Sequence, residues 1–272
     1  MKTKVPRLVI TTSLKATSDV HREAARFSEQ ARLQFMHRKG GSIAAVLQNA
    51  DVALVFSNAG RHLHTTDGQL KFHLGTAYIR LLSLRRGDGD PLVRAGSLKA
   101  GDTVLDTTFG LGRDSIVAAQ AVGPSGRITA FESSAPLYYL AHAGLAAEAN
   151  RTSQTSKIID PITMAKIELR PGDSREFLAL CPDRSFDIVL VDPMFSIPKT
   201  SDPGFALLRA VADPAPLSRS WIVQAKRVAR RYVVLKTAES CPWYAAEGFQ
   251  RVKSPSNATW YRAPGTPPAE QE

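Results

Sequence analysis

The sequence predicts an α/β fold: a mostly parallel sheet with an antiparallel hairpin at one edge and a small α/β appendage at the N-terminus. Helix and strand patterns alternate regularly from about residue 92, and a short strand at 103–106 runs directly into a glycine-rich turn. The 272 residues are enough for one large domain and a smaller unit, and an apolar content of 43 % permits a sizeable core.

The first 90 residues predict the appendage and a helix that connects it to the rest. Apolar alternation or helical spacing defines each element, in the order strand 5–13, helix 18–35, helix 43–49, strand 51–57 and connecting helix 72–86. The segment Gly87–Pro91 contains two glycines and a proline, which break a helix. We therefore expect one unit over residues 1–90.

The larger domain is expected over residues 91–262. Its predicted elements are strand 103–106, helix 114–122, strand 127–131, helix 135–149, strand 167–170, helix 174–180, strand 186–191, helix 218–230 and strand 232–236. Residues 249–252 and 259–262 follow as the edge hairpin. The proline-rich residues 263–272 are expected to be disordered.

The spacing after strand 103–106 favours one kind of nucleotide-like ligand. Asp106 ends the strand, and Gly110 and Gly112 follow in a loop that opens a helix at Arg113. The dinucleotide pattern G-x-G-x-x-G needs glycine at position 115, where Ser115 stands. A carboxylate at the loop suits the ammonium group of S-adenosylmethionine better than a pyrophosphate. We therefore expect S-adenosylmethionine, with an NAD(P)-dependent oxidoreductase as an alternative.

Three later strands also end in acidic side chains. Glu132 can accept both ribose hydroxyls of an adenosine, and Asp173 with Ser174 can meet the adenine amine. Asp192 follows the nearly all-apolar strand 186–191, which is typical of a parallel strand buried on both faces. Because carboxyl ends of parallel strands share one edge, we expect these acids to line one site.

Asp192-Pro193-Met194-Phe195 predicts catalysis on a planar exocyclic amine. The Asp192 carboxylate and the carbonyl beside Pro193 can accept the hydrogens of the amine and localise its lone pair. Pro193 stiffens the turn, and Phe195 can stack the base. Orientation and electrostatics would then suffice, without a metal.

Net charge +10 and a pI near 9.8 favour a polyanionic partner, with nucleic acid as the first candidate. Between Pro214 and Ala238 there is no acid, and a helix would present basic pairs there on one side. The candidate substrate-binding residues are Lys199, Arg230, Arg231 and Lys236. A membrane-spanning run is missing from the sequence, and the two cysteines lack metal-ligand spacing, which favours a reduced, cytoplasmic setting.

The segments LDTTFGLGRDS, FESS, GDS, VDPMF and YVVLK resemble class I S-adenosylmethionine-dependent methyltransferases, in the same order. Over about residues 100–240 the chain is most similar to small-subunit ribosomal RNA guanine-N2 methyltransferases of the RsmJ type. Residues 72–93 resemble a related group of uncharacterised bacterial methyltransferases. The resemblance implies a Rossmann-like sheet and S-adenosylmethionine as cofactor. The matching cofactor-contacting positions are Arg113, Asp114, Glu132, Ser133, Asp173, Ser174 and Asp192.

The resulting interpretation is a methyltransferase that modifies the exocyclic amine of guanine in small-subunit ribosomal RNA. One alternative is the same chemistry on a small molecule or a protein. The others are the oxidoreductase and a catalytically silent RNA-binding module. Ser115 and the Asp-Pro-Met-Phe turn argue against the oxidoreductase, and intact Asp106, Asp192 and Phe195 argue against the silent module.

Overall fold

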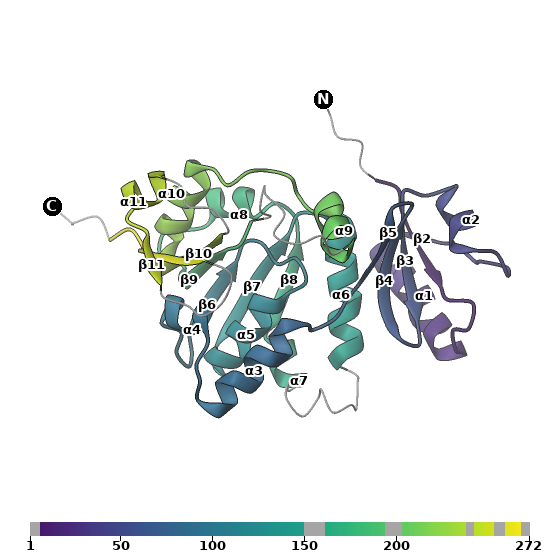
Figure 1. Ribbon diagram of the computed structural model, residues 1–272, viewed down its shortest axis with the longest axis horizontal. Coiled ribbons are helices and arrows are strands. Elements are labelled where there is room, and N and C mark those ends of the chain that lie inside the picture. The colour runs from purple at the N-terminus through teal and green to yellow at the C-terminus, as the bar shows by residue number, and fades with distance from the viewer. Residues whose placement is uncertain (1–5, 150–160, 194–202, 238–241, 253–258, 268–272) are drawn as a thin grey trace.

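The computed structural model describes residues 6–149, 161–193, 203–237, 242–252 and 259–267, whose strands form two sheets (Figure 1). The larger sheet has the strand order β11-β12-β10-β9-β6-β7-β8, and the smaller has the order β2-β1-β3-β4-β5. In the larger sheet β8, β7, β6, β9 and β10 are parallel, while β12 and β11 run antiparallel. The predicted fold class, including the edge hairpin, is confirmed.

The strands of the larger unit follow the predicted alternation closely, whereas the helices at 161–165, 203–211 and 242–246 were not predicted. The strands are β6 (Thr103–Asp106), β7 (Arg127–Glu132), β8 (Ile167–Pro171), β9 (Phe186–Val191), β10 (Ala229–Thr237), β11 (Gln250–Val252) and β12 (Thr259–Pro264). The helices are α3 (Thr76–Arg86), α4 (Pro91–Gly96), α5 (Arg113–Val122), α6 (Ala135–Ala149), α7 (Pro161–Ala165), α8 (Ser174–Leu180), α9 (Pro203–Val211), α10 (Arg219–Val228) and α11 (Pro242–Ala246).

Alternate residues of the parallel strands face two separate cores. Val104 and Leu190 belong to the core that α3 to α7 cover, whereas Leu105 and Val189 belong to the core under α8 and α10. Side chains of a strand point to opposite faces in turn, so one apolar run supplies both layers. The sheet is thus covered by helices on both faces.

The N-terminal unit contains β1 (Leu8–Thr12), α1 (Ser18–Ala31), β2 (Gln34–Phe35), α2 (Ile43–Leu47), β3 (Val52–Ser57), β4 (Gly60–Thr65) and β5 (Gly68–Lys71). Sequence patterns missed β4 and β5, because each carries only one buried apolar residue, Leu63 or Leu70. The predicted helix 18–35 ends early, since Arg32 adopts the left-handed conformation that closes α1.

The small sheet packs beside α6 and α9 of the larger unit (Figure 1). At this junction Phe72 lies against Gly144, where a Cβ would overlap its ring. The connecting helix α3 packs on α5, and Leu81 joins the core of the larger unit. The division of the chain at residue 90 stays a prediction.

The prediction of a disordered tail is wrong for its first residues. β12 continues to Pro264, which pairs with Tyr232 of β10, and the Gly265 N–H then donates to the Arg231 carbonyl at 2.9 Å. A Cβ at Gly265 would overlap the Ala229 carbonyl, so glycine permits this close approach. Residues 263 and 264 therefore belong to β12, and the Thr266 N–H donates to the Lys226 carbonyl at 2.9 Å. Residues 268–272 lie outside the described part of the chain.

Candidate functional site

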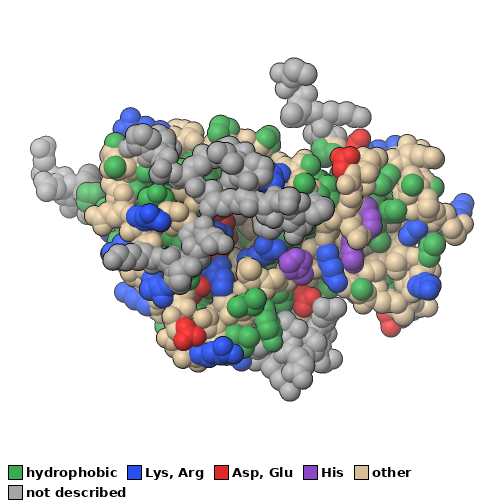
Figure 2. Space-filling view, in the orientation of Figure 1, with side chains coloured by type: hydrophobic (Ala, Val, Ile, Leu, Met, Phe, Trp, Pro, Cys, Tyr) green, Lys and Arg blue, Asp and Glu red, His purple; other side chains and the backbone are tan. Residues whose placement is uncertain are grey.

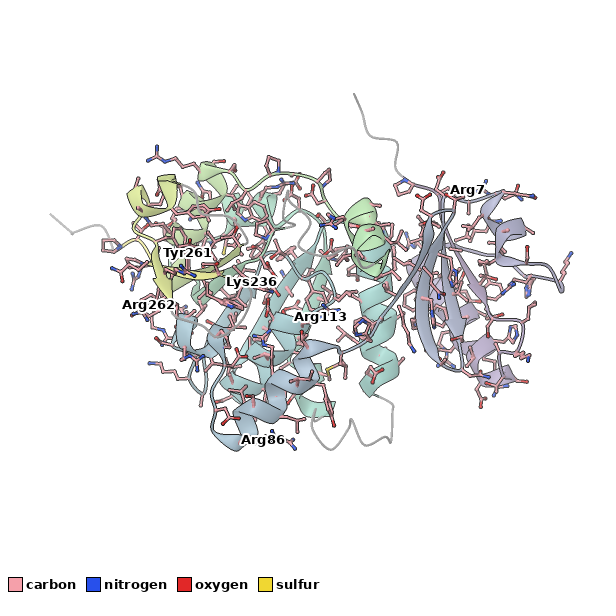
Figure 3. All side chains as sticks on the ribbon, in the orientation of Figure 1. Arg7, Arg86, Arg113, Lys236, Tyr261 and Arg262 are labelled. Atoms are coloured by element: carbon pink, nitrogen blue, oxygen red, sulfur yellow. The ribbon has the colours of Figure 1, made fainter. Side chains whose placement is uncertain are left out.

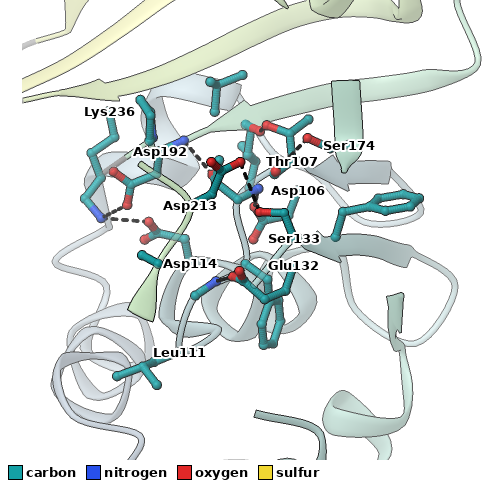
Figure 4. A pocket seen from close by; sticks show the side chains of 18 of the residues that line it. Asp106, Thr107, Leu111, Asp114, Glu132, Ser133, Ser174, Asp192, Asp213 and Lys236 are labelled. Atoms are coloured by element: carbon teal, nitrogen blue, oxygen red, sulfur yellow. Dashed lines mark hydrogen bonds and ion pairs between the residues drawn. The ribbon is translucent and has the colours of Figure 1, made fainter. Parts of the chain in front are cut away.

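A cavity of about 560 Å³ opens where the order of the large sheet reverses, between β6 and β9 (Figure 4). Ligands of open α/β sheets bind at the carboxyl edge beside such a reversal. The structure brings the four predicted strand-end acids to the wall of this cavity: Asp106, Glu132, Asp173 and Asp192.

The loop after β6 has the shape that its two glycines allow. Gly110 and Gly112 have φ of +57° and +73°, a region that other residues rarely adopt. The Phe109 ring lies against Gly112, and the Phe109 N–H donates to the Phe131 carbonyl at 2.9 Å. The loop then opens α5, whose first turn has no side-chain cap. Its leading residues, Arg113 and Asp114, line the cavity.

Gly112→Ala is expected to destabilise the fold by about 2–3 kcal/mol, because it adds a clash with Phe109 to an unfavourable φ. Gly110→Ala is the matched control, since its φ is also positive but nothing lies within 4 Å of the added Cβ. Thermal unfolding of both variants measures the difference. Equal losses of stability would contradict the role given to the Phe109 contact.

Asp106 lies at the end of β6 and is 3 % exposed. Its Oδ2 accepts the Ser115 hydroxyl at 2.6 Å, and its Oδ1 accepts the Thr108 N–H at 3.0 Å. Burial raises the pKa of Asp106 to about 6 in spite of these bonds. Ser115, which departs from the dinucleotide pattern, therefore orients the carboxylate of the loop.

Glu132 is the last residue of β7, and its carboxylate binds the backbone of the glycine loop. One carboxylate oxygen accepts the Gly110 N–H and the other the Ser134 N–H, each at 2.8 Å. Burial raises the pKa of Glu132 to about 7 against these two bonds. A carboxylate oxygen has two lone pairs, so each oxygen can accept one further hydrogen bond, as two ribose hydroxyls require.

The end of the cavity near β8 has two acids: Asp173, which the sequence indicated, and Asp213, which it did not. Asp173 caps α8 by accepting the Arg175 N–H at 2.8 Å, and the Arg175 guanidinium, which also pairs with this carboxylate, lowers the pKa of Asp173. Arg175 also binds Asp213 at 2.9 Å, and Asp213 accepts the Ser133 hydroxyl at 3.2 Å. Asp213 follows a helix rather than a strand, which is why the strand-end pattern missed it.

Ser174 has a structural bond in addition to its place in the wall. Its hydroxyl is buried and donates to the Thr107 carbonyl at 2.8 Å, which ties α8 to the glycine loop. The hydroxyl oxygen can still accept a bond from a ligand.

A chain of alternating charges extends from Asp90 to Asp192, and its members Asp114, Lys236 and Asp192 line the cavity. Asp90 binds Arg80 at 2.8 Å, and Arg80 pairs with Asp114. Lys236 bridges Asp114 at 2.8 Å and Asp192 at 2.6 Å (Figure 4). The sequence placed Asp114 among the cofactor contacts and did not indicate its connection to Arg80 and Asp90. Tertiary structure alone assembles these five groups from α3, the N-cap of α4, α5, the residue after β9, and β10.

The two carboxylates that share Lys236 have opposite pKa shifts. Asp114 has two cations, Lys236 and Arg80, which hold its pKa well below the usual range although burial opposes them. Burial and repulsion from Asp114 raise the pKa of Asp192 to about 7, against the attraction of Lys236. Asp192 keeps 27 % side-chain exposure toward the cavity, and its N–H donates to the Thr108 hydroxyl at 2.7 Å. Of the five groups in this chain of charges, Asp192 is the one that can exchange a proton near neutral pH.

The structure corrects the predicted basic helix. α10 ends at Val228, because Ala229 already has an extended conformation, so Arg230 and Arg231 belong to β10. They lie at its amino-terminal end, away from the carboxyl edge, where Arg230 pairs with Asp187 and Arg231 with Asp102. These arginines are therefore not near the cavity.

The other basic residues of the acid-free window are also paired. Arg219 and Lys226 bind Glu247 at 2.5 and 3.6 Å, and Arg227 pairs with Asp183. Acids distant in the sequence thus neutralise the window, which is not an open basic face. Of the predicted residues, Lys236 and Pro193 line the cavity, whereas Phe195 and Lys199 lie outside the described residues.

The charged and apolar side chains that line the cavity fit S-adenosylmethionine. Six acids line it against three bases, Arg113, Arg209 and Lys236, and this excess of negative charge suits an ammonium and a sulfonium but not a pyrophosphate. Leu111, Phe131 and Trp221 supply apolar walls. The described residues contain no His, Cys, Asp or Glu group arranged to hold a metal ion. They also contain no helix that meets the length and hydropathy of a membrane span.

Comparison with known proteins agrees with this fit. Residues 29–253 match the family model described as "Putative SAM-dependent methyltransferase". The uncharacterized protein YpiP of Bacillus subtilis is 32 % identical over 247 residues, which are 90 % of this chain and 94 % of that protein. Ribosomal RNA small subunit methyltransferase J of Francisella tularensis is 40 % identical over 106 residues, which are 39 % of this chain and 40 % of that enzyme.

Among solved structures, a SAM-dependent methyltransferase of Neisseria gonorrhoeae has the same fold. The TM-score between the two structures is 0.62, and their sequences are 20 % identical. The match covers 94 % of this chain and 95 % of the Neisseria chain. The match of residues 29–253 to the family model sets aside the alternative of an NAD(P)-dependent oxidoreductase. The chain belongs to the family of SAM-dependent methyltransferases, and its cofactor is S-adenosylmethionine.

Proposed function

We propose that this enzyme methylates the exocyclic amine of guanine in small-subunit ribosomal RNA. The observation that carries the proposal is the Asp192 carboxylate, fixed by Lys236 at 2.6 Å and followed by Pro193 in the wall of the same cavity. A second support is the partial similarity to ribosomal RNA small subunit methyltransferase J, which is 34 % identical over 113 residues in Cellvibrio japonicus.

The proposed cofactor-binding residues are Gly112, which shapes the glycine loop, and residues that line the cavity around it. The lining residues are Asp106, Gly110, Arg113, Glu132, Ser133, Asp173 and Ser174. Bound S-adenosylmethionine supplies an electrophilic methyl group on a sulfonium. Glu132 would accept the ribose hydroxyls, and Asp106 would favour the ammonium end. Asp114 is assigned to the charge chain rather than to direct contact, because Arg80 and Lys236 already bind it.

Asp192 acts on the amine in this proposal. Its carboxylate and the Pro193 carbonyl accept the two amine hydrogens, which turns the nitrogen lone pair out of conjugation with the ring. The nitrogen–methyl bond forms as the sulfur–methyl bond breaks, and Asp192 takes the proton that the nitrogen releases. A pKa of about 7 allows Asp192 to accept that proton and return it to solvent. Phe195 is proposed to stack the base.

Removing Lys236 is expected to move the acid limb of the pH–rate profile to higher pH. The positive charge of Lys236 lowers the pKa of Asp192, so Lys236→Met should raise that pKa. The active carboxylate would then form at a pH about one unit higher. Lys236→Arg keeps the charge and should keep the limb near pH 7. Single-turnover rates across pH 5–9 measure both variants. An unshifted limb in Lys236→Met would mean that Asp192 is not the titrating group.

Nucleoside mass spectrometry of ribosomal RNA tests the proposed substrate. RNA from a strain that lacks this protein should miss one methylated guanosine, and the purified enzyme with S-adenosylmethionine should restore it. If every methylated nucleoside persisted and the purified enzyme modified no RNA, the acceptor would be a small molecule or a protein instead.

A further inference from the structure

One face of the N-terminal sheet is only partly covered. The short helix α2 and its flanking residues pack over Val9, Ala53 and Val55 of β1 and β3. On the neighbouring strand β4, His62 and His64 pair directly opposite Val55 and Ala53, so they stand on the same face. Both imidazoles are half-buried, at a part of the sheet that α2 does not reach.

The charged side chains that act on these two imidazoles are cations. Lys71 of β5 pairs opposite His62, and Arg38 acts on His64. Burial, then the positive charges of Lys71, His64 and Arg61, lowers the pKa of His62 to about 4. Burial and Arg38 lower the pKa of His64 as well. This face therefore has a positive field with two neutral aromatic rings, whose centroids are 6.1 Å apart.

The positive face continues to the cofactor cavity. His73 follows β5, and its Nε2 lies 3.5 Å from the Arg113 guanidinium, which lines the cavity. The Nε of Arg113 is buried and has no hydrogen-bond partner among the described residues. Figure 2 shows histidine and Lys or Arg side chains in a row across the junction of the two units, and Figure 3 places Arg113 between the small sheet and Lys236.

We propose that this row is the RNA-binding track of the enzyme, an inference that rests on the proposed function. The track is defined by Arg38, His62, His64, Lys71, His73 and Arg113. Lys71 and Arg38 bind phosphates of the strand next to the target guanine, and the neutral imidazoles of His62 and His64 stack on its unpaired bases. Arg113 guides the strand at the cavity.

This chemistry favours single-stranded RNA over an acidic protein. Flat half-buried imidazoles beside cations present both a stacking surface and a phosphate site, and single-stranded nucleic acids use both. The track also supplies the substrate surface that the paired arginines of the acid-free window do not provide.

The test compares charge reversals at two exposed strand positions of the full-length enzyme. Lys71→Glu lies on the track, and Arg127→Glu is the matched control at the amino end of β7. The probes are a short fluorescein-labelled single-stranded RNA for binding and unmethylated small-subunit ribosomal RNA for methyl transfer. His62→Ala/His64→Ala is a second track variant that removes the rings and leaves the charge at Lys71.

Lys71→Glu should weaken RNA binding about tenfold and lower the slope of log K against log salt by about 1. His62→Ala/His64→Ala should also weaken RNA binding about tenfold, through lost stacking. Arg127→Glu should bind RNA like the wild type, and all three should bind S-adenosylmethionine normally. If the wild type methylates RNA but track and control variants bind RNA alike, the track is wrong and the proposed function stands. If the wild type methylates no RNA and binds an acidic protein there, both are wrong.

Discussion

Asp192→Ala is expected to reduce the rate of methyl transfer about 10³-fold while the affinity for S-adenosylmethionine stays within about threefold of the wild type. The proposed carboxylate touches the amine rather than the cofactor, so its loss should appear in the chemical step. Lys236 would lose one of its two partners but keep Asp114 at 2.8 Å, which holds the lysine in place. Single-turnover rates and calorimetry separate the two quantities.

Two companions make this result specific to Asp192. Asp192→Asn keeps the shape and one acceptor oxygen but cannot take a proton, so it should also lose most of the rate. Asp183→Asn removes an acid that is 70 % exposed and paired with Arg227, and it should behave like the wild type. An Asp192→Ala enzyme with more than about a tenth of the normal rate would exclude the proposed catalytic role.

Glu132→Ala is expected to weaken the binding of S-adenosylmethionine about 10²-fold or more. The change removes the proposed acceptor of two ribose hydroxyls, and bonds to a charged group contribute about 1.5–3 kcal/mol each. It also leaves the N–H groups of Gly110 and Ser134 without their present acceptor, which loosens the loop. Calorimetric titration measures the affinity, and thermal unfolding shows whether the fold persists.

Glu132 should also make cofactor binding depend on pH. The pKa of Glu132 in the free enzyme is raised to about 7, and the ionised form accepts the hydroxyls. Affinity should therefore be highest above pH 7 and should fall by up to about tenfold per unit below it, because binding then releases a proton. The fall in affinity below pH 7 should persist in Asp192→Asn and disappear in Glu132→Gln. A limb retained in Glu132→Gln would assign the titration to another group, such as Asp106.

The fold and the strand-end acids were predictable because both depend on local sequence patterns. A buried parallel strand is an apolar run, and parallel strands place their carboxyl ends on one edge. Asp106, Glu132, Asp173 and Asp192 therefore meet as expected from their positions alone. The two glycines of the loop, Gly110 and Gly112, were likewise recognisable, since their spacing reflects a backbone conformation.

The charges were not predictable, because the sequence shows where a cation is but not which acid it meets. The acid-free window predicted an open basic helix, whereas its arginines and lysines bind acids up to 129 residues away, as Arg231 binds Asp102. The polar strands β4 and β5 carried too few apolar residues to be noticed, and yet they hold His62, His64 and Lys71.

The sequence by itself determined the architecture, the cofactor class and the edge of the sheet where the site lies, because hydrophobic period and glycine spacing act over a few residues. Only the tertiary structure decided which charges are neutralised and which remain available. Lys236 binds Asp192 in the cavity, and Lys71 lies opposite His62 on the N-terminal sheet, where we propose the RNA track. Electrostatic partners are chosen by distance in space, and that distance exists only once the chain has folded.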